Sequence, residues 1–315
     1  MKTIYVIGGA NLDIIARSFN EIIPADSNPG TVSYSIGGVS HNIASNLSLM
    51  GCDVQFVTAF SRDDFGKQIR QHCLDIGLKL DHAQYFDQYA SSLYIAIVQP
   101  DGDMNVAVSD MNILSHLDVE ELKILLSTLT EDDLVVIDTN LTVDQIGEMV
   151  NSCRAKICVD PISTTKAHKI IPYLNRLYFF KPNRIEAEHI LNHPCRNIED
   201  YLYCVRMFVN AGVKNIVISL GSEGLIGSDG EKIIHMSSVK IDVANTTGAG
   251  DGFMAGFVYG SAHNRSFSDC LKYAVAAGCI ALSSNETVNP LMSDGLLEKY
   301  YLKVSDEAEV KEYEI

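Results

Sequence analysis

The stretch Asn-Thr-Thr-Gly-Ala-Gly-Asp-Gly-Phe-Met-Ala-Gly, from Asn245 to Gly256, decides the fold prediction. Its small residues precede an apolar run, which predicts a glycine-rich loop and then a buried helix that begins at or just after Gly248–Gly250. The free N–H groups and the positive dipole end of such a helix bind anions. Asp251 is the one acidic side chain there, so it is a candidate base that takes a proton from a hydroxyl group. An ordinary capped helix is the alternative.

Four buried strand-like segments precede this stretch, and polar residues follow each of them. The segments are 134–137, 156–159, 177–180 and 216–218, followed by Asp138-Thr139-Asn140, Asp160-Pro161-Ile162-Ser163, Lys181-Pro182-Asn183 and Ser219-Leu220-Gly221-Ser222-Glu223-Gly224. Parallel strands end at one edge of a sheet, and ligands of α/β proteins bind at that edge. The alternation of strands and helices therefore predicts an α/β fold with a site at this edge.

Asn183 and Glu186 stand three residues apart at a predicted helix start. Such a pair suits a water-mediated Mg²⁺ site, because Mg²⁺ usually keeps several waters. A capping box is the alternative interpretation. The sequence contains no GxxxxGK[ST], which excludes a P-loop enzyme, and the first strand is not followed by GxGxxG, which disfavours a nicotinamide dinucleotide enzyme.

The N-terminal segment carries a second group of candidates. Residues 4–8 predict a first strand, and Asn11 and Asp13 are expected at its carboxyl end. Gly37 and Gly38 stand at a strand–helix junction, where they allow close approach of a polyol or an anion, and Asn42 lies one turn inside the helix. Turn formation and tight packing are the alternatives. The neighbouring His41 is interpreted as a packing or capping residue.

A small sheet outside the main one is predicted from alternating apolar and polar residues. The pattern occurs in 31–36, 92–98 and 104–108, and Asp101-Gly102 indicates a hairpin between the last two. A turn-rich insertion, 22–30, precedes the first of them. We expect an antiparallel sheet, from about residues 16–36 and 90–112, that acts as a lid or a dimer contact.

Composition restricts the classes of partner. The chain has 315 residues and a net charge of −16, which disfavours nucleic acid because no basic stripe is available. No apolar run reaches the length of a membrane span. The eight cysteines form no CxxC pair and are expected to be reduced, and the N-terminus is strand-like rather than a signal peptide, so the cytoplasm is the expected compartment. The acidic segment 306–314 is expected to be a solvated end.

Four motifs, in order, resemble those of the ribokinase-like sugar kinases, also called the phosphofructokinase-B family. They are Gly37-Gly38-x-x-x-Asn42, Asn183-x-x-Glu186, Ser219-x-Gly221-x-x-Gly224 and Thr247-Gly248-Ala249-Gly250-Asp251. The likeness covers nearly the whole chain. It implies one domain over residues 1–315, a three-layer α/β/α fold with a mostly parallel central sheet and a small β-lid, and ATP-dependent phosphorylation of a sugar hydroxymethyl group.

The resemblance also implies roles for individual residues. Asp251 would be the base, and Gly248, Ala249 and Gly250 the anion hole. Asn11, Asp13, Gly37, Gly38, Asn42 and Asn140 would hold the substrate. Asn183, Ser219, Gly221, Gly224 and Thr247 would face the nucleotide, and Glu186 would hold Mg²⁺ through water.

Within this family the chain is most similar to pseudouridine kinases. The similar stretches are Ala25-Asp26-Ser27-Asn28-Pro29-Gly30, Ser109-Asp110-Met111-Asn112-Ile113, Asp160-Pro161-Ile162-Ser163 and 181–188. The resemblance implies that Asp26, Ser27, Asn28, Asp110 and Asn112 read the nucleobase from the lid, and a homodimer through the lid is plausible. A kinase of ribose, inosine or adenosine, and a non-catalytic nucleoside or nucleotide sensor, are the alternatives.

One position departs from the family pattern. Many members carry Asp where this chain has Asn245, and that Asp often helps to bind a monovalent cation. Asn keeps an oxygen ligand but loses the charge, so K⁺ is only an optional cofactor in this prediction.

Overall fold

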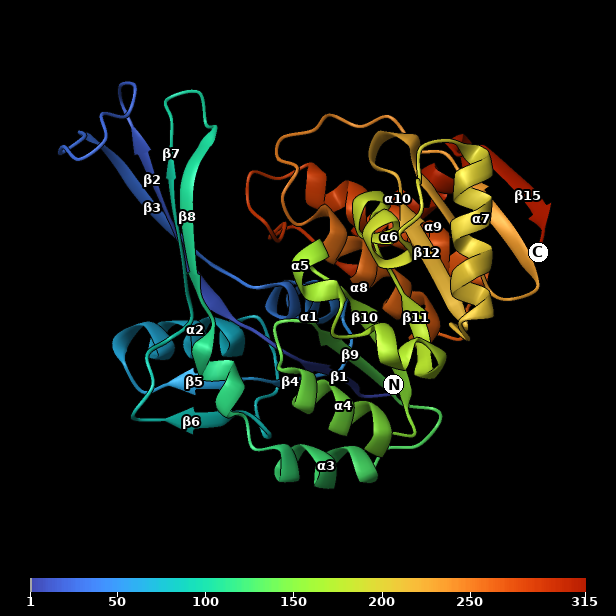
Figure 1. The fold of residues 1–315 in the computed structure, drawn as a ribbon, viewed down its shortest axis with the longest axis horizontal. Coiled ribbons are helices and arrows are strands. Elements are labelled where there is room, and N and C mark those ends of the chain that lie inside the picture. The colour runs from blue at the N-terminus through green and yellow to red at the C-terminus, as the bar shows by residue number, and fades with distance from the viewer. Residues whose placement is uncertain (1) are drawn as a thin grey trace.

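The computed structural model describes residues 2–315 and contains a large sheet, a small sheet and a two-stranded pair (Figure 1). The large sheet has the order β15-β14-β13-β12-β11-β10-β9-β1-β4. Its strands are β1 (Ile4–Ile7), β4 (Val54–Val57), β9 (Leu134–Asp138), β10 (Lys156–Asp160), β11 (Leu177–Phe180), β12 (Asn215–Ser219), β13 (Leu225–Ser228), β14 (Lys232–Met236) and β15 (Val310–Glu314). The six strands from β4 to β12 pair in parallel and the last three are antiparallel. The predicted mostly parallel α/β sheet is confirmed.

Helices cover both faces of this sheet because its strands are apolar on both sides. In β9, Leu134 and Val136 pack in one hydrophobic core, while Val135 and Ile137 pack in the other. On the first face lie α1 (Val39–Leu49), α2 (Asp64–Asp75), α8 (Ala249–Ala262), α9 (Phe267–Leu282) and α10 (Asp294–Glu307). On the second lie α3 (Val119–Ser127), α4 (Val143–Ser152), α6 (Arg184–Leu191) and α7 (Ile198–Asn210). Three layers result.

Short elements complete the connections. They are β5 (Ala59–Ser61), which pairs with β6 (Gln84–Phe86), the one-turn helix α5 (Thr164–Ala167), and the 3₁₀ turns η1 (Asn112–His116), η2 (Ile171–Arg176) and η3 (Gly221–Glu223). All eight cysteines are buried and unpaired, as expected of reduced thiols. None of the helices in residues 2–315 has the length and apolar composition needed to cross a membrane.

The small sheet projects from the body as a long arm (Figure 1). Its order is β3-β2-β7-β8, with β2 (Asn11–Ser18), β3 (Gly30–Gly37), β7 (Leu93–Val98) and β8 (Met104–Asp110). The hairpin between β7 and β8 was predicted correctly. The prediction of a purely antiparallel sheet was wrong, because β2 lies between β3 and β7 and pairs with β7 in parallel. The sheet also begins earlier than the predicted residue 16.

The acidic C-terminal segment is a strand rather than a free end. β15 pairs with β14 from Val310 to Glu314 and forms the edge of the large sheet. Most of its side chains remain exposed, which explains why its composition resembles a solvated tail.

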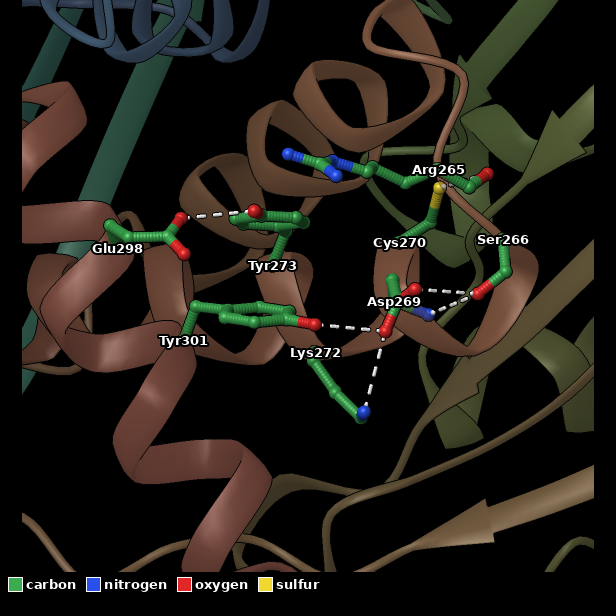
Figure 2. A network of polar contacts seen from close by, with 8 residues as sticks. All are labelled: Arg265, Ser266, Asp269, Cys270, Lys272, Tyr273, Glu298 and Tyr301. Atoms are coloured by element: carbon green, nitrogen blue, oxygen red, sulfur yellow. Dashed lines mark hydrogen bonds and ion pairs between the residues drawn. The ribbon is translucent and has the colours of Figure 1, made fainter.

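Helices α9 and α10 are joined by polar contacts at their exposed side (Figure 2). Asp269 accepts bonds from Tyr301 (2.9 Å) and Ser266 (2.8 Å) and pairs with Lys272 (3.3 Å). Tyr273 donates to Glu298 at 3.0 Å and stacks on Tyr301. These contacts fix the helix that carries Tyr300 and Lys303 toward the large cavity described below.

Candidate active site

The glycine-rich stretch forms the start of α8, as predicted. Gly248 caps the helix with φ of 84°, and a Cβ atom there would lie 2.0 Å from the carbonyl oxygen of Thr287, so no other residue fits. The helix itself begins at Ala249, and Asp251 lies in its first turn. The backbone N–H groups at this end have no partner within the helix. They are therefore available to an anion.

Asp251 is partly buried among other charged groups. It accepts a hydrogen bond of 2.8 Å from Nδ2 of Asn42, which lies on α1. Burial and the nearby Asp160 raise the pKa of Asp251 to about 7, although Asn42 and Lys181 act in the opposite direction. A carboxyl group with a pKa near neutrality is well matched to general-base chemistry, since it can both accept and release a proton.

A buried ion pair lies beside Asp251. Nζ of Lys181 is 3.0 Å from Asp160, and their side chains are only 6% and 8% exposed. A Cβ on Gly250 would lie 3.5 Å from the same Nζ, which places this ammonium group at the start of α8. Neither Lys181 nor Asp160 was assigned an individual role from the sequence. Each comes at or directly after the carboxyl end of a strand, β10 or β11, and that position was the available signal.

A strained turn orients Asp160. Ile162 has φ of 62°, which is rare for a β-branched residue, and its N–H donates to Asp160 at 2.8 Å. The N–H of Ser163 reaches back to the carbonyl of Pro161 at 2.6 Å, which closes a γ-turn around Ile162. Such strain concentrates at functional sites.

The N-terminal candidates come together, but not in the predicted loop. Asn11 and Asp13 begin β2 rather than follow β1, and Nδ2 of Asn11 donates to Asp13 at 2.6 Å. A Cβ on Gly37 would lie 2.1 Å from Asp13, and one on Gly38 would lie 2.6 Å from the Gly9 carbonyl. The two glycines therefore let β3 approach these polar side chains. Burial raises the pKa of Asp13.

Asn140 lies at the same edge. Its Oδ1 accepts a bond of 2.5 Å from Lys166, and its Nδ2 would be 3.6 Å from a Cβ on Gly9. Asp138 connects the end of β9 to α1. Its carboxylate accepts hydrogen bonds from the hydroxyl group of Ser40 on α1 (2.7 Å) and from the N–H of Asn140 (2.8 Å). Lys166 was not selected from the sequence, since the one-turn helix that carries it has no distinctive pattern.

A cavity of about 1080 Å³ adjoins the start of α8. Its lining includes three of the residues predicted to face the nucleotide, Ser219, Gly221 and Gly224, and also Lys181, Lys240, Lys303, Phe253, Tyr300 and Thr246. Thr247 does not line it; its N–H bonds to the side chain of Asn245 at 3.0 Å. Gly224 has φ of 94° and touches the backbone of Met236 closely, so glycine is required at that turn. The volume suits a large polar ligand with an apolar ring.

Asn183 and Glu186 form a capping box at the start of α6. The N–H of Glu186 donates to Asn183 at 2.9 Å, and the N–H of Asn183 donates to one carboxylate oxygen of Glu186 at 2.8 Å. The structure thus contains the capping box that was the alternative interpretation of this pair. Burial raises the pKa of Glu186. Among residues 2–315, no cluster of three His, Cys, Asp or Glu side chains has an arrangement that could hold a metal ion by itself.

Three of the residues predicted to contact the nucleobase lie far from the other candidate site residues. Asp26, Ser27 and Asn28 occupy the turn beyond Ser18, about 23 Å along β2 from Asn11 at the rise of an antiparallel strand. Asn28 holds that turn by bonding to Ile23, with its Oδ1 accepting at 2.8 Å and its Nδ2 donating at 3.0 Å. One chain alone does not bring these three residues to its own site.

Asp110 and Asn112 lie at the near end of the small sheet. Register places Asp110 in a row with Leu93 and Leu12, on the face opposite to Asp13. Its carboxylate accepts the N–H of Asn112 at 3.0 Å. Tyr94 and Ser109 instead share the face of Asp13, and the alternation of β7 and β8 was the signal that could have found them.

Comparison with known proteins agrees with these features. The model of the pfkB family carbohydrate kinases matches residues 1–294. Pseudouridine kinase of Escherichia coli K12 is 30% identical over 292 residues, covering 92% of this chain and 93% of that protein. The solved structure of a carbohydrate kinase from Agrobacterium tumefaciens has a TM-score of 0.83, 24% identity and coverage of 99% and 100%. Phosphofructokinase-2 of E. coli, in complex with potassium, has a TM-score of 0.80 at 20% identity and coverage of 97% and 100%.

The family match spans most of the chain, and the relative at 30% identity covers almost all of it. Members of the family transfer a phosphoryl group to an alcohol, a reaction to which a partly buried carboxylate beside the N-terminus of a helix is suited. The chain therefore belongs to the pfkB family of carbohydrate kinases.

Proposed function

We propose that this kinase transfers the γ-phosphoryl group of ATP to the 5′-hydroxyl of pseudouridine, giving pseudouridine 5′-phosphate and ADP. The observation that carries the proposal is Asp251, partly buried at the start of α8, with its pKa near 7 and with the ammonium group of Lys181 at the same helix start. The likeness to a pseudouridine kinase over nearly the whole chain supports this substrate over other nucleosides.

The reaction is an in-line displacement. Asp251 accepts the proton of the 5′-hydroxyl while its oxygen attacks the γ-phosphorus, and the bond to the ADP oxygen breaks. The amides of Gly248, Ala249 and Gly250 stabilise the transferred charge, and Lys181 adds a positive charge at the same place. Asp160 keeps that lysine protonated and oriented.

Nucleoside and nucleotide approach Asp251 from opposite sides. Asn11, Asp13, Gly37, Gly38 and Asn42 would hold the ribose, because their contacts meet at the junction of β2, β3 and α1. The cavity would take ATP, with Ser219, Gly221 and Gly224 along one wall and Asn183 and Thr247 at its margins.

Glu186 would hold Mg²⁺ through a water. Its second carboxylate oxygen is outside the capping bond with Asn183, and oxygen donors of this kind suit Mg²⁺. When bound, Mg²⁺ neutralises charge on the ATP phosphates. The protein's own part is to fix Glu186 rigidly, which the capping box does.

The small sheet would close the site and form a homodimer. Register places Val32, Ala16, Ile97 and Val106 in one row and Tyr34, Ile14, Ile95 and Val108 in the next, all on one face. The exposed fraction is 69% for Val32 and 70% for Tyr34. A contiguous exposed apolar face of this kind marks an interaction surface. We propose that a second copy of this chain covers the apolar face. The small sheet of that copy would also bring its Asp26, Ser27, Asn28 and Asp110 near the nucleoside site of the first copy.

Recognition of the base would rest on polar side chains. Uracil joined through carbon presents two N–H donors and two carbonyls, and a site built to hydrogen-bond them discriminates better than an apolar pocket. Asn140 follows the end of β9, and Asn112 follows the end of β8 at the base of the small sheet. We assign them to the base, together with the lid residues of the second copy.

A substrate panel tests the proposal. ADP release would be measured with MgATP and pseudouridine, uridine, ribose, inosine or adenosine. We expect pseudouridine to have a kcat/KM well above that of uridine. Higher turnover of ribose or a purine nucleoside would refute the substrate and leave the kinase chemistry intact. No ADP release with any of them would favour a substrate outside the panel or a sensor.

A further inference from the structure

His41 is a buried histidine that the proposed reaction does not use. It lies on α1 directly before Asn42 and is 1% exposed. Its ring packs edge-on against Phe56 of β4, with centroids 6.3 Å apart, and against His72 of α2 at 5.3 Å. An apolar ring could fill the same buried space, so packing does not explain why this residue has two ring nitrogens.

The orientation of Asn42 provides one. An ionised carboxylate only accepts hydrogen bonds, so the NH₂ group of Asn42 must face Asp251 to make the 2.8 Å bond. The carbonyl oxygen Oδ1 of Asn42 then points to Nδ1 of His41, 3.3 Å away. An acceptor in that position requires a proton on Nδ1.

Ser45 is compatible with this tautomer. Nε2 of His41 lies 3.3 Å from Oγ of Ser45, whose hydroxyl can donate either to Nε2 or to the His41 carbonyl. Burial, together with the nearby His72, lowers the pKa of His41 to about 4. The ring is therefore neutral at physiological pH with one N–H donor, and we assign that donor to Nδ1 from the orientation of Asn42.

We propose that His41 is a positioning residue for the catalytic base: its Nδ1–H holds the carboxamide of Asn42 in the one orientation that donates to Asp251. The inference rests on the proposed function in that Asp251 is taken as the base. Without the Nδ1–H, the Asn42 carbonyl would lose its partner. A rotated amide would then place oxygen against the Asp251 carboxylate.

The consequence is a shift in the titration of Asp251. The bond from Asn42 favours the ionised carboxylate, so its loss raises the pKa of Asp251 further. The other charges that face Asp251 are Asp160 and Asp138, which raise its pKa, and Lys181, which lowers it. Around His41 and His72 the charged groups are Asp75 and Glu286, which act on His72. Replacing His41 by an uncharged residue leaves all of these charges unchanged.

The test compares His41→Phe with His41→Gln and with the control His72→Phe. Phe keeps ring volume but has no donor, and Gln restores an N–H in the side chain. The pKa of Asp251 would be read by ¹³C NMR titration of the ligand-free protein, with the resonance assigned by its loss in Asp251→Asn. We expect His41→Phe to raise this pKa by about half a unit to one unit, as loss of a hydrogen bond to the charged form does. His72→Phe should leave it unchanged, and His41→Gln should restore it in part.

Kinetics provide the second readout. In His41→Phe, the acidic limb of the kcat/KM profile should move up by the same amount, while kcat at high pH stays close to that of the parent. An unchanged pKa of Asp251 in a folded His41→Phe protein, a His41→Gln protein whose Asp251 pKa is shifted as far as in His41→Phe, or an equal loss of kcat at every pH overturns the proposal. Full turnover by Asp251→Asn would instead refute the proposed function, and the NMR titration would still decide the role of His41.

Discussion

Asp251 is held where its ionised form is disfavoured, because it is partly withdrawn from water and because Asp160 and Asp138 repel its charge. Asn42 and Lys181 partly compensate. This balance keeps the pKa near the pH at which the proposed base must take up and release a proton. The same balance makes the residue costly for folding.

Replacing this carboxylate tests the chemistry. We expect Asp251→Asn to lower kcat by about 10²-fold or more, the usual effect of losing a general base. Steady-state ADP release at saturating MgATP and nucleoside measures it. The KM values should change little, since Asn keeps the shape of the side chain. Turnover near that of the parent would exclude Asp251 as the base.

The same variant should be more stable above neutral pH. The folded protein raises the pKa of Asp251 from 3.8 to about 7, so it binds a proton more tightly than the unfolded chain. The free energy of unfolding therefore falls as pH rises from about 4 to 7 and stays low above it. Asp251→Asn should gain on the order of 2 kcal/mol at pH 8 and little at pH 4. Thermal melts at both pH values measure the difference.

Asn245 makes the enzyme independent of K⁺ in our prediction. Its Nδ2 donates to the Asn285 carbonyl at 3.2 Å and its Oδ1 accepts from Thr247 at 3.0 Å, so an amide joins the two loops next to Gly248. Turnover should be equal in KCl and in N-methylglucamine chloride. In Asn245→Asp two acceptors would face each other, and turnover should then require K⁺. A strong K⁺ requirement in the unaltered protein would contradict this interpretation.

At the scale of elements, α9 and α10 depend on the polar network in Figure 2. Burial disfavours the charge of Asp269, but the bonds from Ser266, Tyr301 and Lys272 outweigh it and lower the pKa of Asp269. Helix α10 carries Tyr300 into the lining of the cavity. The polar network thus helps to hold Tyr300 at the cavity that we propose for the nucleotide.

Asp269→Ala should weaken that pair. We expect a loss of about 1 to 2 kcal/mol in the free energy of unfolding at pH 7, from removed hydrogen bonds. Since the lowered pKa stabilises the fold only while Asp269 is ionised, the difference should shrink as pH falls below about 4. Urea unfolding at pH 7 and pH 3.5 would show it, with the exposed Asp306→Ala as control. An equal difference at both pH values would contradict the ionic role.

At the scale of the whole molecule, the small sheet separates two functions by face. The face with Asp13, Tyr94 and Ser109 belongs to the proposed nucleoside site, while the opposite face is apolar and exposed. Two-residue periodicity lets one strand serve both, because successive side chains point to opposite sides.

A charge on the apolar face should separate the proposed dimer. We expect the protein to be dimeric in multi-angle light scattering and Val32→Lys to be monomeric, since Val32 is exposed within that face. The matched control is Thr31→Lys, one residue away on the opposite face. Val32→Lys should also lose preference for pseudouridine over uridine. A monomeric parent protein would refute the dimer.

Much of the fold, and several candidate site residues, could be predicted from residues that lie close together in the sequence. Gly248 and Asp251 predicted the start of α8, and the polar residues after β9 to β12 predicted that polar groups gather at one edge of the sheet, because the carboxyl ends of parallel strands meet there. The strand β2 was missed, since Asn11 and Asp13 resemble turn residues when their neighbours in space are unknown. Pairing with β3 and β7 overrides that local preference.

By itself, then, the sequence determined the mostly parallel sheet, the glycine positions and the identity of the proposed base, because each depends on residues close together in the chain. Only the tertiary structure decided which groups meet. Asn42 reaches Asp251 across 209 positions, and Lys181 pairs with Asp160 from a different strand. The pKa of Asp251, the orientation of Asn42 and the face on which Asp110 lies follow from burial and register. Those are properties of contacts between distant segments, which no local pattern encodes.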